Sequence, residues 1–125
     1  MPFTYADNVV EESTTTTTGA YQCTGVPSSG VAPGVQTWLA GIGDGNTSPY
    51  FAYERSGTAW ERGLGTVVSG SPNTLTRTKI YSSSNANAAV DWTGKTVRIR
   101  AIVSAKAERI ALNRAHLLLS SAGVF

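Results

Sequence analysis

The sequence is poor in the residues on which much protein chemistry depends. It has one cysteine, Cys23, and one histidine, His116, among its 125 residues. A single cysteine excludes an internal disulfide, and a single histidine excludes a metal site built on several histidines. Charged residues make up only 14% of the chain, about half the usual fraction. We therefore expect neither a metal nor another cofactor.

Long apolar runs are also missing. No stretch approaches the roughly 18 apolar residues of a membrane-spanning helix. The first residues, MPFTYADNVVEE, have neither the basic region nor the apolar run of a signal peptide. We expect no membrane contact, and synthesis and assembly in a cytoplasm.

The few charges are unevenly distributed. Residues 1–54 contain no Lys or Arg and sum to −5, whereas residues 55–125 sum to +7. Either folding mixes the two halves, or an acidic surface on one copy meets a basic surface on the next. Nucleic-acid binding is not expected, because the basic residues are scattered and no aromatic residues are interleaved with them as a stacking platform requires.

Short β-branched and aromatic stretches alternate with turns rich in Gly, Pro, Ser and Asn. The predicted strands are 20–24, 35–42, 50–54, 59–68, 74–81 and 97–103. In the last, Val97 and Ile99 alternate with Arg98 and Arg100, as in a strand with one buried face. No helical pattern interrupts these stretches. The fold is therefore expected to be all-β, an antiparallel β-sandwich or small barrel.

Three regions are expected along the chain. Residues 1–18, with a run of five threonines, form an N-terminal arm or edge strand, and residues 19–103 form the β-sandwich. Residues 104–125 form a C-terminal interface segment, either an amphipathic helix or an extended arm. Its candidate interface residues are Ile110, Leu112, Leu117, Leu118, Leu119, Phe125, Arg109 and Arg114. The alternative is that this segment covers an open end of its own sandwich.

The candidate catalytic residues have simpler interpretations. The candidate acid–base carboxylates are Asp44, Glu54, Glu61 and Asp91. Asp44 lies in a GDGN turn, while Glu54 and Glu61 neighbour arginines that can pair with them. Gly63 and Gly65 lack the strand-to-helix context of a phosphate-binding loop. Cys23 is interpreted as a buried strand residue. We predict that the chain is not an enzyme.

Five aromatic residues could line a sugar-binding face, since flat rings stack on pyranose surfaces: Trp38, Tyr50, Tyr53, Trp60 and Trp92. Trp38, Tyr53 and Trp60 fall inside predicted strands, where aromatic side chains fill the space between sheets. We therefore expect these aromatic residues to pack in the core and not to bind a ligand.

The segment 34–92 resembles a known module. It reads GVQTWLAGIGDGNTSPYFAYE, then AWERGLGTVVSG, then NTLTRTKIYSSSNANAAVDW. This order resembles a module of small tailed-bacteriophage virion proteins and of the N-terminal parts of phage tail and tail-fibre-associated proteins. The likeness spans roughly residues 5–100, and its most specific piece is NTLTRTKIYSSSN. The chain departs from the module after Arg100, where it adds the segment 104–125.

The resemblance implies a structural subunit of a tailed-phage virion, at the tail, the tail tip or the fibre-attachment region. It implies no catalytic residues. Its partners would be other copies of the chain and neighbouring virion proteins, assembled in the host bacterial cytoplasm. Two alternatives remain: a capsid decoration or cement protein, and a carbohydrate-binding receptor module for a host surface glycan.

Overall fold

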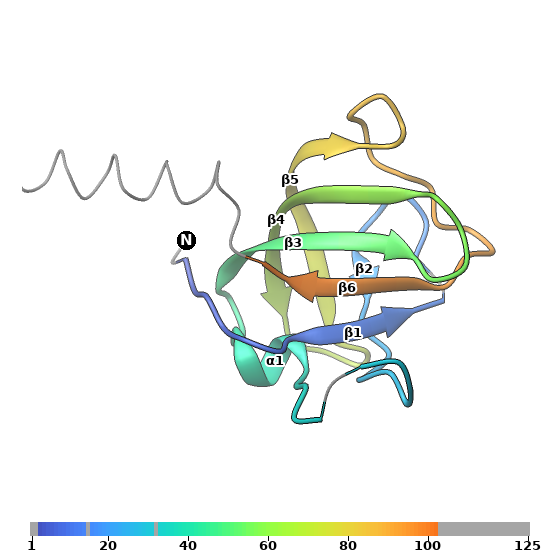
Figure 1. Cartoon of the computed structure of the whole chain (residues 1–125). Coiled ribbons are helices and arrows are strands. Elements are labelled where there is room, and N and C mark those ends of the chain that lie inside the picture. Colours follow the sequence, from blue (N-terminus) through green and yellow to red (C-terminus); the bar gives the residue numbers. More distant parts are fainter. Residues whose placement is uncertain (1–2, 15, 32, 103–125) are drawn as a thin grey trace, which may run out of the picture.

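Six antiparallel strands form a single curved sheet (Figure 1). The computed structural model describes residues 3–14, 16–31 and 33–102. The strands are β1 (Val10–Ser13), β2 (Tyr21–Gln22), β3 (Thr47–Glu54), β4 (Trp60–Val68), β5 (Thr74–Ser83) and β6 (Val97–Ala101). Their order across the sheet is β1-β6-β3-β4-β5-β2, so β6, from the end of the described chain, lies between β1 and β3.

The two edges of the sheet are joined by backbone hydrogen bonds. Glu12 in β1 donates its N–H to the carbonyl of Gly25 (3.0 Å), and Thr24 donates its N–H to the carbonyl of Glu12 (2.9 Å). These bonds connect β1 to the chain that follows β2, so the sheet is nearly a barrel and its edges are paired. The prediction of an all-β antiparallel fold is confirmed, and the barrel-like alternative describes it.

Strand alternation decides which side chains fill the barrel. In β6, Val97 and Ile99 are fully buried and Arg100 is exposed, as their alternation predicts, but Arg98 is also buried, because it pairs with Glu12 and bonds to the carbonyls of the 29–30 loop. In β4, buried Glu61 and Gly63 alternate with exposed Arg62 in the same way. The largest fully buried side chains include Trp38, Trp92, Tyr21, Tyr50, Leu75 and Ile99.

One short helix replaces a predicted strand. Residues 35–42 were predicted as a strand, but the structure has α1 (Trp38–Gly41) there. The Thr37 hydroxyl caps this helix by accepting from the Ala40 N–H (3.1 Å), and the Trp38 ring donates to the Ile99 carbonyl (3.1 Å). Trp38 and Ile42 are both buried, four residues apart, which is the spacing of one helical face. The strand prediction was wrong because so short an apolar run shows neither the periodicity of a helix nor that of a strand.

No helix in the described ranges is long and apolar enough to cross a membrane.

Candidate functional site

A buried polar cluster inside the barrel is built around the carboxylate of Glu61. Glu61 is 0% exposed, and its Oε2 accepts hydrogen bonds from the hydroxyls of Tyr21 (2.6 Å) and Tyr50 (2.5 Å). Its Oε1 accepts from the Val90 N–H (2.9 Å). Arg77 Nε lies 3.0 Å from Oε2 but is not aligned for a hydrogen bond, so this contact is an ion pair. The carboxylate is thus paired and hydrogen-bonded, as burial requires.

This cluster is closed to solvent. The Arg77 side chain is only 4% exposed, and its terminal nitrogens donate to the carbonyls of Val90 (2.8 Å) and Thr17 (3.2 Å). Burial, followed by neighbouring Tyr21 and the negative charge of Glu61, raises the pKa of Tyr50 far above its usual value. A substrate could not reach these groups without opening the barrel. We interpret the cluster as structural.

The other candidate carboxylates each have a local partner. They are Asp44 with the Ser69 N–H (2.9 Å), Glu54 with Lys95 Nζ (3.5 Å) and Asp91 with the Thr93 N–H (3.0 Å). The hydrogen bonds from Thr93 lower the pKa of Asp91. Within residues 3–14, 16–31 and 33–102, no group of three or more His, Cys, Asp and Glu side chains is placed to hold a metal ion.

Cys23 is buried beside another buried acid. Its side chain is 7% exposed, and burial, the charge of Glu11 and a hydrogen bond to Glu11 raise the pKa of its thiol to about 12. Burial likewise raises the pKa of the Glu11 carboxyl, which accepts from the Trp38 N–H (2.8 Å). The thiol is therefore held in its unreactive protonated form.

We expect Cys23 to resist a thiol-specific alkylating reagent at pH 8 until the protein unfolds. A thiol with a pKa of about 12 is ionised about a thousandfold less at this pH than an ordinary one. The measurement is the alkylation rate by mass, with and without denaturant. A Thr18→Cys/Cys23→Ala variant, whose new thiol would lie at an exposed position, is the control and should react at once. Equal alkylation rates for the two folded proteins would contradict the burial and raised pKa of the Cys23 thiol.

The outer surface of the barrel carries a different group of residues. We call it the Arg–aromatic face: Phe51 and Tyr53 of β3, Trp60 and Arg62 of β4, and Arg100 of β6. Phe51 lies opposite Arg62 on one neighbouring strand and opposite Arg100 on the other, and Tyr53 lies opposite Trp60. These side chains share one face because each lies at an outward position of its strand.

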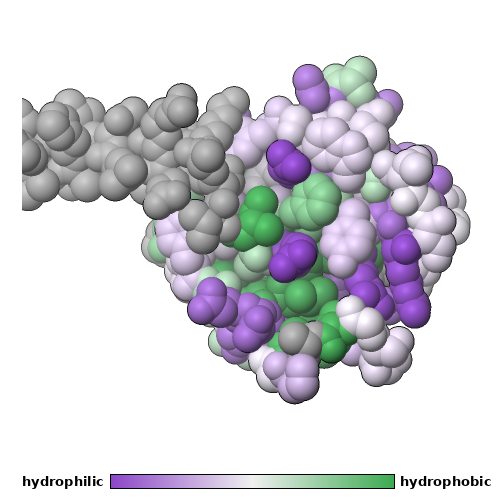
Figure 2. Space-filling model, in the orientation of Figure 1, coloured by the Kyte–Doolittle hydropathy of each residue, from purple (hydrophilic) through white to green (hydrophobic). Residues whose placement is uncertain are grey.

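Direct contacts join four of the five members of this face. The Arg62 guanidinium carbon lies 5.3 Å from the centre of the Phe51 ring and 5.4 Å from that of Trp60, within the range of cation–π attraction. The rings of Phe51 and Tyr53 stack with their centres 5.5 Å apart. Figure 2 shows polar and apolar side chains side by side over the part of the barrel where β3 and β6 face the viewer.

Two predictions about the aromatic residues are corrected by this arrangement. Tyr53 and Trp60, predicted to lie in the core, are half-buried on the outside, while Trp38, Tyr50 and Trp92 are fully buried. The expectation that aromatic and basic residues are not interleaved was also wrong. Sequence reasoning did not select Phe51, Arg62 or Arg100 as site residues. The alternating pattern of β3 and β4 is visible in the sequence. The sequence does not show which strands are neighbours in the sheet.

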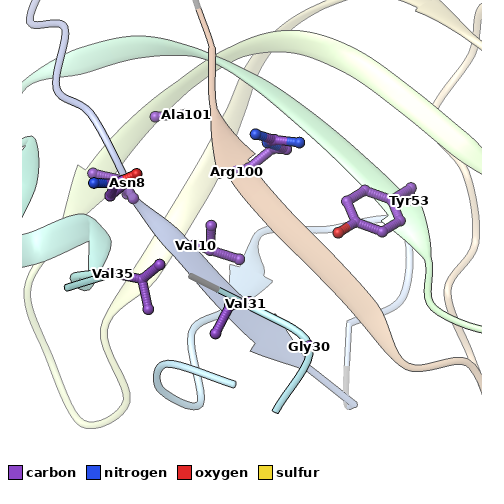
Figure 3. A pocket seen from close by; sticks show the side chains of 9 residues that line it. Asn8, Val10, Gly30, Val31, Val35, Tyr53, Arg100 and Ala101 are labelled. Carbon is purple, nitrogen blue, oxygen red and sulfur yellow. The ribbon is translucent and has the colours of Figure 1, made fainter. Parts of the chain in front are cut away.

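A hollow of about 210 Å³ adjoins the Arg–aromatic face. Its lining residues are Asn8, Val9, Val10, Gly30, Val31, Val35, Tyr53, Arg100 and Ala101. Figure 3 shows Val10 on β1 and Val31 on the adjacent loop across from Arg100 of β6 and Tyr53 of β3. The hollow thus combines an apolar wall with one guanidinium and one phenol, and two of its residues belong to the face.

Ion pairs show what folding does with the uneven charges. Glu12 pairs with Arg98 (3.0 Å) and Arg55 (3.8 Å), and Glu54 pairs with Lys95, so folding mixes the acidic and basic halves. In the described part of the chain, three cations have no carboxylate within 4 Å: Arg62, Lys79 and Arg100. Two of these three belong to the Arg–aromatic face.

All eight interface residues predicted in the segment 104–125 lie outside the described residues. The chain matches no protein-family model, no curated protein and no solved structure.

Proposed function

We propose that this chain is a structural subunit that acts by binding other proteins, and that it serves in the virion of a tailed bacteriophage. The Arg–aromatic face is the observation that carries the binding role. Tryptophan, tyrosine and arginine are the residues that most often dominate the energy of protein interfaces. Here they lie together on the outside of a paired sheet, beside a hollow with one apolar wall that can receive a partner's side chain.

The placement of the reactive groups supports binding over catalysis. Glu61, Tyr21 and Tyr50 satisfy one another inside the barrel, and the Cys23 thiol is protonated and buried. The hollow on the outer surface is lined by no carboxylate, thiol or imidazole among its described residues. It therefore offers shape and charge to a ligand, but no acid–base pair.

The resemblance of residues 34–92 to tailed-phage modules supports the place of action. On that basis the subunit is proposed for the tail, the tail tip or the fibre-attachment region. A capsid decoration protein is the alternative within the same class. The number of copies in purified particles, measured by quantitative mass spectrometry, separates the two: a few to dozens for a tail component and hundreds for a decoration protein. Particles that lack the chain would contradict both.

We expect the full chain to form a defined oligomer that dissociates when residues 104–125 are removed. The apolar residues of this segment, such as Leu117 and Leu118, favour burial against another copy. The measurement is the molar mass by light scattering, with circular dichroism to confirm that the shortened chain is folded. The matched control is a full-length chain with Leu117→Ser and Leu118→Ser, which should also dissociate. A monomer in all three samples would contradict self-assembly through this segment.

A further inference from the structure

We infer that the Arg–aromatic face docks an acidic segment of a different protein, with an apolar side chain of that segment in the hollow beside Arg100. This inference rests on the proposed binding role and names the chemistry of the partner.

The charge of the face favours an anion from elsewhere, although the exposed Asp7 lines a second hollow together with Arg100. Arg62 and Arg100 have no carboxylate partner in the part of the chain that the structure describes. The acid on the neighbouring outer position, Glu12, is already committed to Arg98 (3.0 Å) and Arg55 (3.8 Å). A partner carboxylate can be bound by the planar guanidinium of either free arginine through two parallel hydrogen bonds. The face therefore favours Asp and Glu side chains.

The hollow has room for an apolar group next to that carboxylate, against one wall, while Asn8, Tyr53 and Arg100 line its other sides. Val10, Val31 and Val35 form its apolar wall, and Arg100 lines it on the side of the Arg–aromatic face. A leucine-sized side chain in the hollow would leave the neighbouring residues of its segment beside Arg100. An alternating acidic and apolar sequence matches both features of the site.

The site is also held in place before a partner arrives. The Arg98 guanidinium donates to the carbonyls of Ser29 (2.7 Å) and Gly30 (3.1 Å), which ties the loop carrying Val31 to β6. Arg62 is held over the rings of Phe51 and Trp60. Binding to side chains that are already ordered costs less conformational entropy.

Charge argues that the partner is not a second copy of this chain. Of the acidic residues that the structure describes, only Asp7, Asp44 and Asp91 are exposed, and Asp44 accepts a hydrogen bond from the Ser69 N–H (2.9 Å). The segment 104–125 carries Lys106, Arg109 and Arg114 against a single acid, Glu108, so it has the same sign of charge as the face. A segment from a different, acidic protein is the complementary occupant.

Neither a nucleic acid nor a glycan fits the site as well. Arg62 lies over the rings of Phe51 and Trp60, which a nucleic-acid base would need for stacking. Sugar hydroxyls could hydrogen-bond to Asn8, Tyr53 and Arg100 of the hollow, but its three-valine wall offers them no partner. Both classes are therefore included as competitors in the test.

The test measures binding of short fluorescent peptides to the full chain by anisotropy. We expect a Glu–Leu alternating peptide to bind, its Lys–Leu counterpart not to bind, and its Glu–Ser counterpart to bind more weakly. Arg100→Gln and Arg62→Gln should each weaken the Glu–Leu peptide about tenfold or more. Lys79→Gln is the matched control, because it removes an equally unpaired cation from β5, outside the face, and should change affinity little. Both arginines are exposed, so their variants should keep the melting temperature.

Several results would overturn the inference. They are equal binding of acidic and basic peptides, no effect of Arg100→Gln, and tighter Arg100-dependent binding of oligothymidylate or heparin. If the peptides fail while particles contain the chain, the partner chemistry is wrong and the proposed function stands. If the Glu–Leu peptide binds but particles lack the chain, the docking site stands and the virion role is wrong.

Discussion

Replacing Glu61 with alanine is expected to lower the free energy of unfolding by about 3–5 kcal/mol, because the change leaves the buried Arg77 without its counter-ion. The Arg77 side chain is 4% exposed, and its other hydrogen bonds go to two carbonyl oxygens and the Tyr21 hydroxyl, none of which neutralises its charge. The hydroxyls of Tyr21 and Tyr50 lose their shared acceptor as well. Since small domains are stable by only about 5–15 kcal/mol, this one change threatens the whole fold.

Chemical denaturation monitored by tryptophan fluorescence measures the effect. The matched control is Glu54→Ala, which removes the same side chain from the partly exposed ion pair with Lys95 and should cost about 1 kcal/mol or less. A Glu61→Leu/Arg77→Met double variant should recover much of the loss, because no charge is left buried without a partner. Similar losses for Glu61→Ala and Glu54→Ala would show that the cluster does not stabilise the barrel.

Replacing Gly63 with alanine is expected to destabilise the protein by about 3 kcal/mol, at the upper end of what one added methyl group costs in a packed core. A Cβ at this position would overlap the backbone carbonyl oxygen of Lys79 and lie 3.0 Å from the Tyr50 hydroxyl. Backbone cannot move aside as a flexible side chain can. The pairing of β4 with β5 is already irregular here, with a register shift between Arg62 and Gly63.

Gly19→Ala is the control for this substitution. Nothing lies within 4 Å of a Cβ at Gly19, so the change should alter the free energy of unfolding by about 0.5 kcal/mol or less. Thermal melting of both variants against the unmodified protein measures the difference. A Gly63→Ala protein as stable as the control would mean that β5 shifts easily away from β4.

The two glycines of the ERGLGT stretch illustrate how a local motif can mislead. Gly63 and Gly65 are spaced as in phosphate-binding loops, yet both face the barrel interior from β4. A Cβ on Gly65 would lie 2.6 Å from Leu75 Cγ. They are glycines because β5 approaches closely.

The sequence by itself determined the class of the fold and the positions of β4, β5 and β6. The alternation of Val97 and Ile99 with Arg98 and Arg100, and the Gly, Pro and Asn turns, act over a few residues and need no tertiary contact. The apolar residues 38–42 suit a strand as well as a helix. The tertiary contact of the Trp38 ring with the Ile99 carbonyl favours the helix α1.

Tertiary structure alone decided the two polar assemblies of this protein. Whether Glu61 is solvated or buried depends on Arg77, Tyr21 and Tyr50, which come from other strands. The Arg–aromatic face requires β6 to lie beside β3, although more than forty residues separate them in the chain. Strand order is chosen by which pairing buries the most apolar surface and closes the barrel, and no local pattern carries that information.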